Sequence, residues 1–178
     1  MKPEQDFCIQ LIHIGKCGGS TVISMLKQNK IKYNKIHITK PIFNNHDKYL
    51  IVLRNPIERF ISAFNWRYKL VVIDKIQNKR FIGEKEVLQK YKSVNTLAEN
   101  IREFNINETY IHHIKENISF YLDDFLKDCR KENIIGVVIT EKLNSDMKHI
   151  FGIDFENIHK KKIIHKMKKY FQILVTNF

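Results

Sequence analysis

Apolar residues gather in short blocks along this chain, and the blocks predict strands that alternate with helices. Three blocks are nearly continuous, as is typical of buried strands in a parallel sheet: 7–12, 49–53 and 134–139. A looser block at 31–38 predicts a further strand, which ends before Pro41. Strands that alternate with helices predict an α/β fold built on a central, mostly parallel sheet.

Helical patterns occupy the segments between these blocks. The clearest helix begins with Asn55 as its N-cap and Pro56 at its first helical position. Its apolar residues recur at 57, 60, 61 and 64, a spacing that places them in one stripe facing the core. Further helices are predicted at 22–27, 95–101, 108–129, 146–151 and 163–174, with loop and short helix mixed over 72–92.

The composition predicts one basic domain over residues 1–178, because the length suits a single domain and 43% of the residues are hydrophobic. The formal net charge of +12 favours an anionic partner, such as a nucleotide, an acidic glycan, a nucleic acid or a membrane surface. The three cysteines show no C-x-x-C spacing, which argues against a zinc site and favours a reducing, cytoplasmic compartment. No signal peptide or transmembrane segment is predicted.

A glycine-rich stretch follows the first predicted strand and precedes the first predicted helix. This stretch, here called the glycine loop, reads Gly15, Lys16, Cys17, Gly18, Gly19, Ser20 and Thr21. Glycines permit a tight turn that brings main-chain N–H groups to an anion, and the helix N-terminus adds partial positive charge. Because Lys16 precedes the last glycine, the spacing is not that of a Walker A loop. The stretch favours a phosphate cradle over the alternative, an ordinary strand-to-helix turn.

Three groups of polar residues follow predicted strands. The glycine loop, His37 and Arg54 each come after the C-terminal part of one. Ligands of parallel α/β sheets bind beyond the carboxyl ends of the strands, so these groups are expected to share one edge. Ser62, two turns into the helix after Arg54, is expected to approach the same ligand as Arg54.

Two motifs together resemble those of carbohydrate sulfotransferases related to heparan sulfate 2-O-sulfotransferase and their bacterial relatives. Residues 12–21 resemble the loop of that family that holds the 5′-phosphosulfate. Residues 53–64 resemble its 3′-phosphate motif, in which an arginine and a serine flank a Pro-x-Glu-Arg core. Residues 138–143 are similar to a later strand that ends in a glutamate. The resemblance implies a P-loop-like three-layer sandwich, with a C-terminal part shorter than the family's.

The resemblance also implies an activity: transfer of a sulfuryl group from 3′-phosphoadenosine 5′-phosphosulfate to a hydroxyl or amine of a carbohydrate, with no metal. Such a transfer needs in-line positioning and stabilisation of charge on the leaving phosphate. By resemblance, Lys16 neutralises that charge and the glycine loop, 15–21, holds the 5′-phosphate. Arg54 and Ser62 hold the 3′-phosphate, for which Arg59 is a weaker candidate, its alternative role being an ion pair with an acidic residue.

An acceptor hydroxyl needs a general base, and a histidine that is neutral near pH 7 is the usual group. His37 is the candidate, because it lies between the two motifs where the related enzymes place a catalytic histidine. His46 is the second candidate for the base and Glu141 the third. His13 is interpreted as structural. The adjacent His112 and His113 do not form a metal pair because they diverge by about 100° on a helix; solvated or core-edge roles are favoured for them over the alternative that one faces the acceptor.

Several further roles stay open. Cys17 has neighbours that lower a thiol pKa, so a nucleophilic role stands beside that of a small loop residue. The adenine has four candidate aromatic partners: Trp66, Tyr68, Phe81 and Tyr91. In the family a C-terminal segment closes over the nucleotide as a lid; here either Lys160, Lys161 and Lys162 replace that lid or it is absent.

Two other functions compete with sulfuryl transfer. A P-loop-like kinase or NTPase would use the glycine loop for ATP, although the Gly-Lys-Ser/Thr ending is absent. A non-catalytic basic module would bind a polyanion, with steep dependence on salt. Nucleic acid is the less favoured partner, and peripheral contact with a membrane stays open. The oligomeric state is not predicted.

Overall fold

The computed structural model describes residues 7–101 and 110–153, and its centre is a four-stranded sheet. The strands are β1 (Ile9–His13), β2 (Tyr33–Ile36), β3 (Lys48–Leu53) and β4 (Ile134–Ile139). Every pair is parallel and the order is β2-β1-β3-β4, which confirms the predicted α/β class and its parallel sheet. β3 is buried from Tyr49 to Val52, as the continuous apolar block predicts.

The register brings the carboxyl ends of the strands to one edge. Ile12 of β1 lies opposite Ile36 of β2 and Ile51 of β3, and Leu53 of β3 lies opposite Ile139 of β4. The segments that follow these strands therefore start from neighbouring points. We call this side of the sheet the carboxyl edge.

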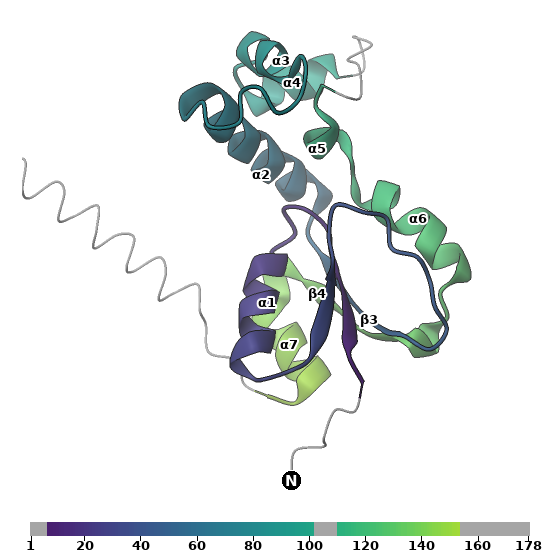
Figure 1. Cartoon of the computed structure of the whole chain (residues 1–178). Helices are drawn as coiled ribbons and strands as arrows, with labels where there is room; N and C mark the ends of the chain where they lie inside the picture. The colour runs from purple at the N-terminus through teal and green to yellow at the C-terminus, as the bar shows by residue number, and fades with distance from the viewer. Residues whose placement is uncertain (1–6, 102–109, 154–178) are drawn as a thin grey trace, which may run out of the picture.

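Helices cover both faces of the sheet. Figure 1 shows α1 (Gly19–Gln28) and α7 (Leu143–Phe151) together on one side, and α6 (Ile118–Asp128) on the other. Val22, Met25 and Leu26 of α1 are buried in the main core. On the α6 side, the ring of Phe125 meets that of Tyr49 edge-on at 4.8 Å between centroids. The three layers of the predicted sandwich are therefore present.

A second group of helices packs beyond the carboxyl edge (Figure 1). It consists of α2 (Pro56–Tyr68), the π-helix η1 (Lys69–Ile73), α3 (Glu84–Lys90), α4 (Val94–Asn100) and α5 (His112–Lys115). We call this group the helical unit. It has its own hydrophobic cluster, formed by Ala63, Phe64, Val71, Leu88, Tyr91, Leu97, Ile111 and Ile114. Two 3₁₀ turns, η2 (Lys131–Asn133) and η3 (Thr140–Lys142), flank β4.

The helical unit also encloses an ion pair. Arg67 and Glu84 both have side chains only 1% exposed, and the guanidinium donates to both carboxylate oxygens of Glu84. The Arg67 Nε to Glu84 Oε1 distance is 2.7 Å, and Arg67 Nη1 donates to Gln77 Oε1 at 2.7 Å. The pair therefore joins α2, α3 and the loop between them.

The prediction of one helix over 108–129 is wrong. α5 ends at Lys115, and α6 begins at Ile118 after the N-cap Asn117. The Asn117 side chain accepts a hydrogen bond from the main-chain N–H of Phe120 at 2.8 Å, which starts a new helix. The apolar periodicity continues across the break, so the pattern alone does not reveal it.

Two smaller predictions also need correction, and one is confirmed. The strand predicted over 31–38 is limited to β2, and Ile38 has a positive φ of 75° that no strand continues through. In α2, Ile57 is 70% exposed instead of facing the core. The predicted cap is confirmed, since the Asn55 side chain accepts from the N–H groups of Ile57 and Glu58.

Some predictions lie outside the described residues, namely the helix at 163–174 and the lid residues at 160–162. Over residues 7–101 and 110–153, no helix has both the length and the apolar character needed to cross a membrane.

Candidate anion-binding site at the carboxyl edge

The glycine loop connects β1 to α1, as predicted, and turns through two residues with positive φ. Lys16 has φ 70°, and Gly18, the N-cap of α1, has φ 75°. A left-handed lysine costs about 1–2 kcal/mol, so neighbouring contacts must hold this turn. The N-terminal N–H groups of α1 point out of the helix at this end, where they are suited to an anion.

Thr140 supplies one of those contacts. It follows β4 directly, and its Oγ1 lies 2.8 Å from the carbonyl oxygen of Cys17 and 2.9 Å from that of Leu53. One hydroxyl proton is thus shared between the glycine loop and the end of β3. A Cβ on Gly18 would come within 3.0 Å of this oxygen, so a side chain there would disturb the contact.

Arg54 also reaches the glycine loop, which brings the two predicted motifs together. Its Nη1 donates to the carbonyl oxygen of Lys16 at 3.4 Å. Glu58 Oε2 lies 3.4 Å from Nη2, and Glu141 Oε1 lies 3.7 Å from Nε. These distances exceed the 2.7–2.9 Å typical of strong charge-assisted bonds. The guanidinium is therefore loosely held, and an anion with better geometry can compete for it.

The other members of the predicted 3′-phosphate motif lie differently. Ser62 is half-buried on the second turn of α2, and none of the Arg54 contacts described above includes it. Arg59 is only 2% exposed and donates to the main-chain oxygens of His113 and Ile114. Arg59 therefore bridges α2 and α5 through two long hydrogen bonds of 3.4 Å.

Lys16 points towards the helical unit. Its ammonium lies 4.8 Å from the ring centroid of Trp66, a cation–π distance. Burial, and then the positive charge of Arg54, lowers the pKa of Lys16. Of the four aromatic residues considered for adenine, Trp66 is thus the one in contact with the lysine of the glycine loop.

Of the adjacent His112 and His113, one of which was a less favoured candidate to face the acceptor, His113 lies at this site. Its ring lies 5.0 Å from that of Trp66, and a Cβ on Gly15 would come within 3.0 Å of its Cε1. Burial, followed by the charges of Arg59 and Arg67, lowers its pKa to about 3, so the imidazole is neutral at pH 7. Within the described part of the chain its buried Nε2 has no hydrogen-bond partner.

His37 lies on the other side of the glycine loop, stacked on His13. The two rings are 4.3 Å apart, and His37 Nδ1 lies 2.7 Å from the carbonyl oxygen of His13. A carbonyl oxygen only accepts, so Nδ1 carries the proton and leaves Nε2 as the basic nitrogen of neutral His37. Burial, and then His37, lowers the pKa of His13 to about 4.

The other candidate bases have different surroundings. His46 is exposed in a turn, where its main-chain N–H donates to Asn44 Oδ1. Glu141 is engaged with Arg54 and with the N–H of Asn55. Of the three, His37 is the one with a hydrogen bond to the end of β1, at the carbonyl oxygen of His13.

Cys17 is a packing residue of the glycine loop. Its side chain is fully buried, and burial raises the thiol pKa to about 11, which argues against the nucleophilic role. Its main-chain N–H donates to Ile14 at 3.2 Å and is thereby unavailable to a ligand. Ser20 is exposed and Thr21 half-buried on the first turn of α1, where their hydroxyls were predicted.

Within residues 7–101 and 110–153, no group of three or more His, Cys, Asp or Glu side chains gathers in a way suited to a metal ion. Comparisons of the chain with protein-family models, with curated proteins and with solved structures find no match.

Proposed function

We propose that this protein is a sulfotransferase that binds 3′-phosphoadenosine 5′-phosphosulfate and transfers its sulfuryl group to a carbohydrate. The contact between Arg54 and the carbonyl oxygen of Lys16 supports the proposal most directly. It joins the two motifs that resemble the 5′-phosphosulfate loop and the 3′-phosphate motif, although 38 positions separate these residues. A ligand with two separated anionic groups suits a lysine-bearing loop beside an arginine.

The residues have complementary parts in the reaction. The acceptor oxygen forms a bond to sulfur as the bond between sulfur and the bridging phosphate oxygen breaks. Lys16 stabilises the negative charge that develops on that phosphate, and the N-terminal N–H groups of α1 help to hold it. The Nε2 of His37 takes the proton of the acceptor hydroxyl. The products are a sulfated carbohydrate and adenosine 3′,5′-bisphosphate.

The position of Lys16 favours this donor over ATP. In a Walker A loop the lysine follows the last glycine and reaches the β- and γ-phosphates from the start of the helix. Here Lys16 precedes Gly18, and its ammonium lies over the ring of Trp66 in the helical unit. The proposed donor has a single 5′-phosphate, and the oxygen that bridges this phosphate to sulfur lies on its outer side. A lysine at the side of the loop suits that position.

Calorimetric titration with adenosine 3′,5′-bisphosphate tests donor binding. Binding is expected to be saturable and to weaken about tenfold or more in Lys16→Ala and in Arg54→Ala, since each loses a charge-assisted contact. Lys27→Ala, at an exposed position in the last turn of α1, is the matched control and should bind normally. Adenosine 5′-monophosphate should bind more weakly than the bisphosphate. Absence of binding at millimolar bisphosphate, or tighter binding of magnesium–ATP, would contradict the proposal.

Transfer of labelled sulfate from the donor to a panel of glycans tests catalysis and identifies the acceptor. His37→Ala should reduce turnover while leaving bisphosphate binding unchanged, because His37 acts on the acceptor. His46→Ala, an exposed histidine, is the control. Full turnover by His37→Ala would show that another group is the base.

A further inference from the structure

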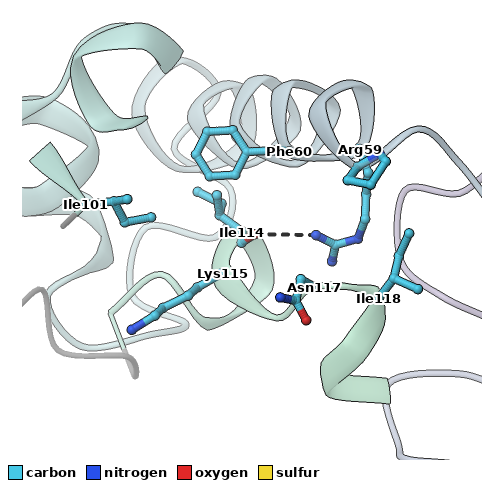
Figure 2. Close-up of a pocket in the computed structure, with 8 residues that line it drawn as sticks. Arg59, Phe60, Ile101, Ile114, Lys115, Asn117 and Ile118 are labelled. Atoms are coloured by element: carbon cyan, nitrogen blue, oxygen red, sulfur yellow. Dashed lines mark hydrogen bonds between the residues drawn. The ribbon is translucent and has the colours of Figure 1, made fainter. Parts of the chain in front are cut away.

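A cavity of about 380 Å³ lies between the first turns of α2 and the junction of α5 with α6 (Figure 2). Its volume is within the range of small-molecule sites, about 300–1,000 Å³. Most of its wall is apolar and comes from Pro56, Phe60, Ile101, Ile114 and Ile118. Lys16, His37, Arg54 and Ser62 do not line this cavity, although Pro56, Arg59 and Phe60 belong to the same segment, 53–64, as the predicted 3′-phosphate motif.

Arg59 and Lys115 are the charged residues that line this cavity, and Arg59 is only 2% exposed. Figure 2 shows its guanidinium between Ile114 and Ile118, with a hydrogen bond to the carbonyl oxygen of Ile114. That bond and the one to the carbonyl oxygen of His113 are both 3.4 Å long, near the limit for a hydrogen bond. The Nε–H group has no hydrogen-bond partner in the described part of the chain.

No carboxylate of residues 7–101 and 110–153 forms an ion pair with Arg59 within 4.0 Å. Glu116 acts on it electrostatically, but the Glu116 carboxylate accepts its close hydrogen bond, 2.7 Å, from the hydroxyl of Tyr121. A buried charge is costly unless an opposite charge and hydrogen bonds compensate it. Two long bonds to carbonyl oxygens leave much of the five-donor guanidinium unsatisfied.

We propose that the cavity binds a small monocarboxylate carried on an apolar chain or ring, with the carboxylate on Arg59. A planar guanidinium matches a carboxylate in two parallel hydrogen bonds. The apolar body then lies against Phe60 and the isoleucines of the wall, removed from water. One charge is expected on the ligand, because Arg59 is the buried cation of the cavity, whereas Lys115, which also lines it, is exposed.

The test uses octanoate as the probe and octanamide, its neutral counterpart of similar size, as the comparison. Calorimetric titration at pH 7.5 and low salt should show saturable binding of octanoate, and at least about tenfold weaker binding of octanamide. Ile101→Phe, which fills part of the cavity, should weaken octanoate binding about tenfold. The same substitution at Ile82, which is 89% exposed and outside the cavity, should leave it unchanged.

Arg59→Gln should abolish the preference for octanoate over octanamide, and circular dichroism shows whether this variant is folded. If it is not, Ile101→Phe against Ile82→Phe still decides the site. Lys16→Ala should bind octanoate normally, whatever its effect on adenosine 3′,5′-bisphosphate. Failure of octanoate to bind at about 10 mM, equal binding of octanamide, or unchanged binding to Ile101→Phe would overturn the proposal.

Discussion

The buried ion pair between Arg67 and Glu84 offers a sharp test of how the helical unit is held together. Glu84→Gln removes the negative charge but keeps the size of the side chain. It leaves the Arg67 guanidinium, 1% exposed, without its carboxylate partner. Gln77, which also accepts from Arg67, is neutral and does not replace the lost charge.

The magnitude follows from the depth of the pair. Breaking one partner of a fully buried pair typically costs about 3–5 kcal/mol of unfolding free energy. For a chain of this size each kcal/mol lowers the melting temperature by about 2–4 °C, so Glu84→Gln should lower it by about 6–20 °C. The double variant Arg67→Met/Glu84→Leu replaces both charged side chains and so leaves no unpaired buried charge. It should therefore be more stable than Glu84→Gln.

Thermal and urea unfolding followed by circular dichroism measure these differences. The matched control is Lys69→Gln, which breaks an ion pair to Asp74 with a similar distance of 2.7 Å. The Lys69 side chain is 63% exposed, so this loss should cost less than about 1 kcal/mol. The reasoning fails if Glu84→Gln is no more destabilising than Lys69→Gln. It also fails if the double variant loses as much unfolding free energy as Arg67→Met and Glu84→Leu lose when made singly and added.

Three further predictions concern the glycine loop and its neighbours. Gly19→Ala places a Cβ 2.0 Å from His13 Cδ2 and should destabilise the fold by about 1–3 kcal/mol, measured by urea unfolding; an unchanged midpoint contradicts this. The pKa of His13 is lowered to about 4 and that of His113 to about 3, from 6.5, so unfolding takes up protons in acid. The melting temperature should therefore be constant above pH 6.5 and decrease as the pH falls towards 4. Replacing either histidine by glutamine should make this decrease smaller. A thiol reagent at pH 7.5 should modify exposed Cys8 and spare Cys17 in the folded protein; rapid reaction of both contradicts the burial of Cys17.

Much of the fold could be predicted because the signals are local. The continuous apolar block at 134–139 matches β4 residue for residue, and Asn55 with Pro56 marks the start of α2. The break at Asn117 could not be predicted from periodicity, because apolar residues keep the same spacing on both sides of it. The exposure of Ile57 is also not local, since it depends on which side of α2 meets the other helices.

Some residues of the candidate site could likewise be predicted from local signals in the sequence, and others could not. The glycine loop, Arg54 and Thr140 each follow a strand, and a parallel sheet brings the ends of its strands to one edge. Arg54 was predicted as a site residue because it follows a predicted strand. Thr140 also follows a predicted strand, so the same signal could have predicted it. His113 carries no such signal, because its place beside Gly15 depends on how α5 packs against α2.

The glycine loop is held from two sides, and this links ligand binding to the stability of the helical unit. Thr140 anchors it from the sheet through the Cys17 carbonyl, while Trp66 contacts the Lys16 ammonium from α2. Trp66 in turn lies 5.3 Å from Arg67, a member of the buried ion pair. If a ligand binds only while Trp66 holds Lys16, it binds only the packed form of the helical unit. Ligand binding then shifts the equilibrium towards that packed form by mass action. Local opening of that unit therefore removes the support of Lys16 and leaves the Thr140 anchor in place, so anion affinity should fall before the sheet unfolds.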